Sequence, residues 1–105
     1  MCTLALLRDR PSHAYELAAR LDSVGLTGVS YGTVYPLVTR LRRLGLVEES
    51  IEASQLGPPR KIYRLSDEGR RTLTRWAAEW MAGVATLQEL LAATGVLSDI
   101  SEETR

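Results

Sequence analysis

A chain of 105 residues, 45% of them hydrophobic and 25% charged, is one small folded domain. It has no apolar run of roughly 18 residues and no charged secretory start, so we expect it in the cytoplasm, away from membranes. One cysteine and one histidine exclude a disulfide or a structural zinc site within the chain and leave too few groups for catalysis, so we expect no enzyme, metal or cofactor. The net charge of zero conceals an asymmetry, with nine Lys or Arg against six Asp or Glu in residues 1–65 and four against seven in residues 66–105.

The first two predicted helices are short. Residues 3–7 are apolar and are closed by Pro11 and the charges before it. Ser12 suits the N-cap of a second helix, in which apolar residues recur at three-and-four spacing. These are Ala14, Leu17, Ala18, Leu21 and Val24. The nine residues "DSVGLTGVS" that follow hold two glycines and no periodicity, which predicts a loop with Val29 as the stub of a strand.

A third helix is predicted from the stretch "SYGTVYPLVTRLRRLG", which Gly45 ends. One face carries its buried residues, namely Val34, Leu37, Val38, Leu41 and Leu44. Pro36 lies inside the helix if Ser30 is the N-cap, and in the first turn if Thr33 is the cap. Either alternative distorts or loosens the start of this helix.

After Gly45 the apolar period changes from three and a half to two. Residues 47–53 and 60–65 alternate as two strands, and the turn residues "SQLGPP" between them predict a hairpin with a six-residue tip. Ser66, followed by Asp67 and Glu68, suits the N-cap of a last helix that runs to about Ala93, roughly 40 Å. Three helices followed by a hairpin are typical of the winged helix-turn-helix, whose third helix enters a major groove of DNA.

The outward face of the third helix has the residue types that DNA contacts require. Small residues allow close approach, hydroxyl groups donate or accept, and guanidinium groups bind phosphate or guanine. The candidates are Ser30, Gly32, Thr33, Tyr35, Pro36, Thr39, Arg40 and Arg43. The alternative interpretation of Gly32 and Pro36 is that they only shape the junction between loop and helix.

Cations at the hairpin and at the second helix extend this candidate interface. Arg60 and Lys61 directly follow the rigid turn "GPP", which indicates a wing that contacts phosphates, although adjacent cations also keep an exposed edge strand soluble. His13, in the first turn of the second helix, could meet a phosphate at that positive helix end or be incidental.

The last helix carries an apolar stripe too long for one small domain to cover. Its members are Leu73, Trp76, Trp80, Val84, Leu87 and Leu91, with Ala77, Met81 and Leu90 beside them. We therefore expect this stripe to form a homodimer interface. Trp76 and Trp80 are either interface anchors or the walls of a pocket for a flat aromatic inducer. Residues 95–105 are polar and are expected to fray.

Three fragments in order resemble a known family. "HAYELAARL", "SYGTVYPLVTRLRRLGLVEE" and "GPPRKIYRLSDEGRRTL" together resemble the PadR family of bacterial and archaeal winged-helix transcription regulators, over residues 4–75. Each fragment alone is weakly specific, whereas all three at these distances are strongly so. The chain departs from the pattern at Ala14, where glycine is usual, and in its first helix, which starts at Met1 with little of the segment that members pack against the partner subunit.

The resemblance implies a homodimeric repressor that binds a palindromic operator, dimerises through its C-terminal helix and often responds to a small-molecule inducer. In this chain Ser30, Gly32, Thr33, Tyr35 and Pro36 match the recognition-helix motif of the family, and Arg60 and Lys61 match its wing.

We thus expect a mainly α fold with a small β-hairpin (α+β): a winged helix-turn-helix DNA-binding domain over residues 1–66, a dimerisation helix over 67–94 and a polar tail over 95–105. One alternative function is a winged-helix protein-protein interaction module without DNA, which the zero net charge and three hairpin glutamates, Glu48, Glu49 and Glu52, favour. Another is a carrier of planar aromatic ligands built around the two tryptophans.

Overall fold

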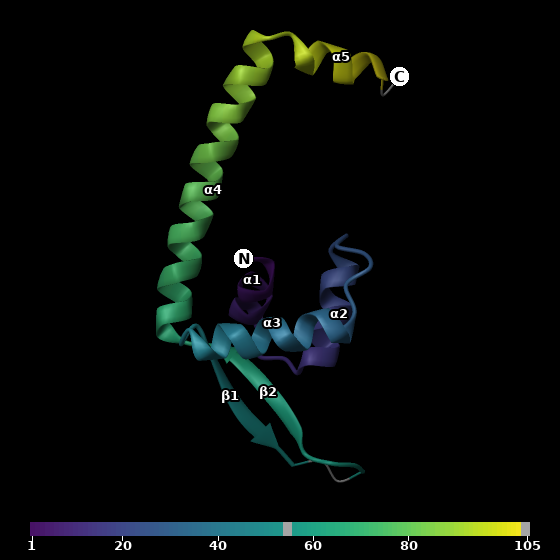
Figure 1. The fold of residues 1–105 in the computed structure, drawn as a ribbon, viewed down its shortest axis with the longest axis vertical. Coiled ribbons are helices and arrows are strands. Elements are labelled where there is room, and N and C mark those ends of the chain that lie inside the picture. The colour runs from purple at the N-terminus through teal and green to yellow at the C-terminus, as the bar shows by residue number, and fades with distance from the viewer. Residues whose placement is uncertain (54–55, 104–105) are drawn as a thin grey trace. The chain divides into compact units, whose positions relative to one another are not determined.

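A computed structural model describes residues 1–53 and 56–103. Its elements follow the predicted order (Figure 1). They are α1 (Cys2–Asp9), α2 (Ala14–Ser23), α3 (Tyr31–Arg43), β1 (Val47–Glu52), β2 (Arg60–Leu65), α4 (Asp67–Ala93) and α5 (Val96–Glu103). The predicted α+β fold, a winged helix-turn-helix with a long C-terminal helix, is confirmed. The chain divides into two compact units, the first ending at Thr74 and the second beginning at Arg75.

The core of the first unit is small and almost entirely aliphatic. It is built from one face of each of α1, α2 and α3, from the inner side of the hairpin and from the start of α4. Its largest fully buried side chains include Leu4, Leu17, Val34, Val38 and Tyr63. Because this core holds α3 from one side only, the opposite face of α3 is left exposed.

The hairpin is joined to the helices through the segment before α2. β1 and β2 pair antiparallel from Val47 opposite Leu65 to Glu52 opposite Arg60. Ser12 adds a bridge to Tyr63, in which each backbone N–H donates to the other's carbonyl, at 3.0 and 2.8 Å. The tip residues Ser54 and Gln55 lie outside the described residues. The wing is therefore fixed to the start of α2 as well as to α3.

This bridge corrects the predicted cap of α2. Ser12 is extended and buried, and the N-cap is His13, whose Nδ1 accepts a hydrogen bond from the Glu16 backbone N–H at 3.2 Å. A serine is the commoner cap, but Ser12 is already committed to the backbone ladder with Tyr63. Val24, expected in the core, is exposed because α2 ends at Ser23, and Val29 forms no strand.

Helix α3 begins after Ser30, which decides between the two predicted starts. Ser30 has the extended backbone of an N-cap but makes no side-chain cap bond, and Pro36 lies inside the helix. Since proline has no N–H, the Gly32 carbonyl lacks its helical donor. The helix ends where Gly45 takes a φ of +77°, a conformation that favours glycine.

The buried face of α3 differs from the predicted one. Val34, Val38 and Leu41 are buried, as expected, but Leu37 is exposed and Leu44 is 59% exposed. The helix is rolled toward the hairpin, since Tyr35 and Arg42 on that flank contact hairpin side chains. The apolar periodicity of a helix gives the width of its apolar face, but it does not say against which neighbouring element that face packs.

The start of α4 is locked against the turn between α3 and β1. Ser66 caps the helix as predicted, accepting from the Gly69 N–H at 2.9 Å, and its hydroxyl donates to the Gly45 carbonyl at 2.6 Å. The Ser66 N–H donates to the Leu46 carbonyl at 3.1 Å. Gly69 packs so closely that a methyl group there would overlap the Leu46 carbonyl oxygen.

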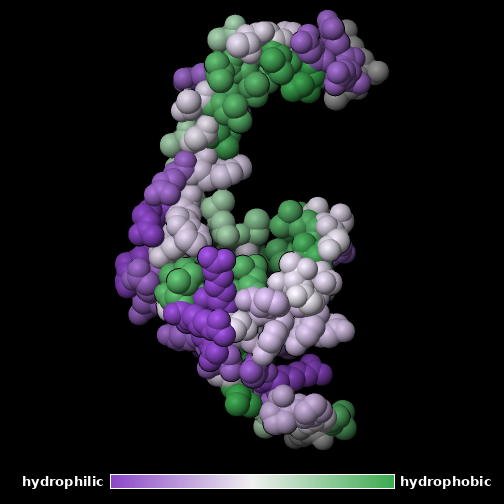
Figure 2. Space-filling model, viewed as in Figure 1, coloured by the Kyte–Doolittle hydropathy of each residue, from purple (hydrophilic) through white to green (hydrophobic). Residues whose placement is uncertain are grey.

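The second unit consists of the rest of α4 and of α5. The expectation of a frayed tail is wrong for Val96–Glu103, which form α5, because Val96, Leu97 and Ile100 recur at helical spacing. Figure 2 shows apolar side chains along one side of this unit and polar ones on the other. Within residues 1–53 and 56–103 no single helix could cross a bilayer; only α4 and α5 taken together, across an 85° bend, have the length and composition.

Candidate nucleic-acid interface

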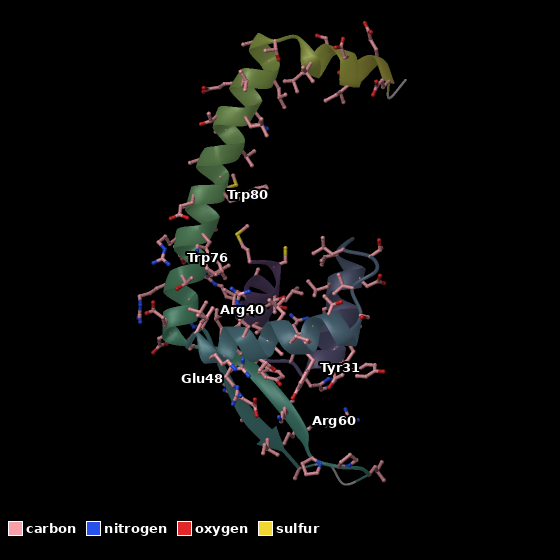
Figure 3. All side chains as sticks on the ribbon, in the orientation of Figure 1. Tyr31, Arg40, Glu48, Arg60, Trp76 and Trp80 are labelled. Carbon is pink, nitrogen blue, oxygen red and sulfur yellow. The ribbon has the colours of Figure 1, made fainter. Side chains whose placement is uncertain are left out.

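The exposed face of α3 carries most of the candidates that the sequence predicts. Gly32, Thr33, Tyr35 and Pro36 are exposed near its start, and Arg40 and Arg43 near its end. Thr39 is half-buried, and its Oγ1 donates to the Tyr35 carbonyl at 2.9 Å, which leaves its oxygen free to accept. These residues do not all point the same way, because Arg40 leaves α3 on the side away from the hairpin (Figure 3).

A row of three tyrosines joins α2 to α3. The ring centroids of Tyr15 and Tyr31 lie 5.0 Å apart, those of Tyr31 and Tyr35 lie 5.7 Å apart, and both pairs are stacked. Tyr15 is 71% exposed, so the row presents aromatic edges and faces to solvent. Exposed aromatic rings of this kind can stack on bases or pack against sugars.

Sequence analysis missed two members of this row. Tyr31 and Tyr35 are four residues apart on one helix, so their spacing was a usable signal for a pair. Tyr15 belongs to α2, and nothing in the sequence indicates that it would stack on Tyr31. Its place in the interface follows from the packing of α2 against α3.

Lys61 of β2 extends the row onto the hairpin. Its Nζ lies 5.8 Å from the centroid of the Tyr35 ring and 3.5 Å from the Tyr35 hydroxyl oxygen. The hydrogen bond to Tyr35, and then the charge of Glu49, raise the pKa of Lys61 above its usual range. These contacts hold the Lys61 ammonium group beside α3.

A pocket of about 570 Å³ opens between α2, α3 and the hairpin. Its lining includes Tyr15, Tyr31, Tyr35, His13, Arg60 and Lys61. The structure thus brings four of the predicted residues together here, namely Tyr35, His13, Arg60 and Lys61. The arrangement is an aromatic wall with cations at its rim, which suits a nucleic-acid backbone with its bases and sugars.

His13 is itself the N-cap of α2, at whose positive end it was predicted to meet a phosphate. Its own Nδ1 accepts the Glu16 N–H, so the ring nitrogen occupies the position that a phosphate oxygen would take. While Nδ1 accepts, a neutral ring carries its proton on Nε2 and can donate from there. Among residues 1–53 and 56–103, no three His, Cys, Asp or Glu side chains are grouped closely enough to hold a metal ion.

Comparison with known proteins decides what kind of chain carries this interface. Residues 3–75 match the transcriptional regulator PadR-like family. The chain belongs to the PadR-like family. The crystal structure of a PadR-like regulator from Bacillus cereus superposes with a TM-score of 0.76 and 36% sequence identity. The match covers 86% of this chain and 87% of that one. A PadR-like protein from Bacteroides fragilis is 34% identical, with 85% of each chain covered and the same TM-score.

In two further comparisons this chain spans less than half of the other protein's length. The probable transcriptional regulator Rv1176c of Mycobacterium tuberculosis is 32% identical over 78 residues, which is 72% of this chain but 41% of that relative's length. PadR of Bacillus subtilis, solved in complex with operator DNA, shares the fold at 22% identity and a TM-score of 0.66, over 72% of this chain and 44% of that one. The family to which this chain belongs is one of transcriptional regulators.

Proposed function

We propose that the chain is a homodimeric, sequence-specific DNA-binding repressor of a palindromic operator. The observation that carries the proposal is the convergence of Tyr35, Arg60 and Lys61 on one open pocket between α3 and the hairpin. The operator complex of Bacillus subtilis PadR, a protein of the same fold, supports it. Repression and the palindrome rest on the family resemblance.

In this proposal residues 1–66 bind DNA and α3 lies in the major groove. Gly32 and Ser30 allow the start of α3 to approach the bases, while Thr33, Tyr35 and Thr39 offer hydroxyl groups to base edges or backbone. Arg40 and Arg43, near the end of α3, contact guanine or phosphate, and Pro36 loosens the start of the helix. The wing cations Arg60 and Lys61 contact flanking phosphates, with His13, Tyr15 and Tyr31 beside them.

Residues 67–94 form the dimer interface in this proposal. No residue from 75 to 103 is buried, and Trp80 and Leu87 are 56% and 51% exposed. An apolar helix face of this length is stable in water only when a second surface covers it. A two-fold dimer would place two α3 helices in half-sites about 34 Å apart. Trp76 and Trp80 are the candidates for binding a flat aromatic effector.

Replacing Tyr35 with alanine is expected to weaken sequence preference at the base that Tyr35 contacts while leaving general DNA affinity. The change removes a ring that stacks on Tyr31 and supports Lys61, and a hydroxyl that reaches a base edge; a good base contact contributes about 1–3 kcal/mol of discrimination. The measurement is selection of bound sequences from a random duplex pool. Tyr35→Phe, which keeps the ring, should retain a weaker preference. An unchanged consensus from Tyr35→Ala would exclude Tyr35 as a residue that contacts a base.

Changing Arg60 and Lys61 together to alanine is expected to weaken binding to every duplex about equally. The plot of log affinity against log salt should become shallower by about one to two units, since each phosphate contact contributes about 0.9. The control is Arg64→Ala with Arg71→Ala, which removes two exposed cations that do not line the pocket. Equal slopes for the two double variants would exclude the wing as the phosphate contact. Absence of salt-dependent binding by the unchanged chain would favour the protein-interaction alternative.

A further inference from the structure

We propose that Glu49 is a specificity-determining residue of this regulator, which positions the two cations Arg42 and Lys61 between the recognition helix and the wing. The proposal rests on the proposed DNA-binding function. The two carboxylate oxygens of Glu49 face different partners. Oε2 lies 3.4 Å from Arg42 Nε of α3, and Oε1 lies 3.7 Å from Lys61 Nζ of β2. One acidic side chain thus connects elements that the sequence separates.

The pleat of the hairpin places Glu49 on its inner side. Glu49 stands opposite Tyr63, which is fully buried, whereas Glu48 is exposed and stands opposite Arg64. Since side chains alternate along a strand, Glu49 faces α3 and Glu48 faces away from it. The Glu49 side chain is only 17% exposed, while its partners Arg42 and Lys61 are each close to half exposed.

Glu49 completes the set of groups that hold Lys61. The ammonium group lies near the Tyr35 ring and its hydroxyl on one side and near the Glu49 carboxylate on the other. A lysine side chain is otherwise flexible, and fixing it in one position costs side-chain entropy. Because Lys61 is already held in the free protein, this cost is not incurred again when DNA binds. Arg42 contacts the same carboxylate through Nε, at 3.4 Å, and its guanidinium group has further N–H groups that can donate.

The same carboxylate opposes phosphates of any sequence. Non-specific binding is almost entirely electrostatic, so an acidic group beside two interface cations lowers the affinity for every duplex. When Arg42 and Lys61 are held in fixed positions, they bind most tightly to a duplex whose phosphates lie at matching positions. Glu49 therefore weakens general binding while supporting specific binding, and both effects raise the ratio of specific to non-specific affinity.

Two substitutions separate these effects. Glu49→Gln is expected to strengthen binding to random duplex about fivefold and to steepen its salt slope by about one unit, while the duplex selected by the unchanged chain gains little, so that the affinity ratio falls about fivefold. Glu49→Asp keeps the charge but is one methylene too short for both cations. It should leave the random-duplex affinity and slope unchanged and still lower the ratio.

Glu48→Gln is the matched control, because it removes the same charge from the neighbouring residue on the outer side of β1. Its affinity ratio should equal that of the unchanged chain. The proposal is overturned if Glu49→Gln and Glu49→Asp both keep the ratio within twofold, or if Glu48→Gln lowers it as much as Glu49→Gln does. If the unchanged chain binds no duplex at all, the proposed function fails and this proposal with it. Thermal unfolding of each variant checks that the fold is retained.

Discussion

Gly69→Ala is expected to destabilise the first unit by about 3 kcal/mol and to lower its unfolding temperature by about 10 °C or more. The added methyl group would overlap the Leu46 carbonyl oxygen and come to 2.7 Å from Leu65 Cδ1. Relief requires α4 to move away from the turn after α3, which weakens the bonds of Ser66 to Gly45 and Leu46. Thermal and denaturant unfolding followed by circular dichroism measure the loss.

Gly32→Ala is the matched control for this prediction. Gly32 also lies in the first turn of a helix, but a methyl group there would meet Ser30 Oγ at the ordinary distance of 3.6 Å and would overlap nothing in the described parts of the chain. Alanine at this position is expected to leave stability unchanged or to raise it by up to about 1 kcal/mol. A Gly69→Ala protein as stable as the original would show that α4 does not start against Leu46.

Leu87→Glu is expected to dissociate the dimer and thereby to lower operator affinity by about a hundredfold or more. Leu87 lies on the exposed apolar side of α4, and a carboxylate buried there in a dimer would lose its hydration without gaining a partner. Two linked DNA-binding units gain affinity through their effective concentration, and this gain disappears in the monomer. Sedimentation equilibrium gives the mass, and titration of the selected duplex gives the affinity.

Ala85→Glu introduces the same charge two residues earlier, on the opposite side of α4. The mass and the operator affinity of this variant should match those of the unchanged chain, because glutamate is a good helix former and remains in water. A Leu87→Glu protein that still sediments as two chains would contradict the dimer interface proposed here. If both variants dissociate, the interface extends around the helix and the apolar stripe does not define it.

The element order was predictable because each element has its own local signal. The three-and-four spacing of α2 and α3, the alternation of β1 and β2, and the turn residues at the hairpin tip are properties of short windows. Ser66 was a correct prediction for the same reason, since its cap bond closes within three residues. α5 was not predicted, because the expectation for residues 95–105 followed their polar composition and not the helical spacing of their apolar residues.

The candidate site was predictable as a set of residue types and much less as an arrangement. Tyr35, Arg60 and Lys61 were named from the helix face and the turn, and they line one pocket. The roll of α3, which exposes Leu44 and turns Arg40 away from the hairpin, could not be read from periodicity. It depends on which neighbour the helix packs against.

By itself, the sequence determined the elements from α1 to α4 and their order, the Ser66 cap of α4, and the family to which the chain belongs, because these depend on residues close together along the chain. Only the tertiary structure decided that Tyr15 stacks on Tyr31, that Ser12 joins the hairpin and leaves His13 to cap α2, and that Glu49 meets both Arg42 and Lys61. Each of these contacts joins two elements. Whether it forms is decided by how the elements fill a shared core, which local spacing does not encode.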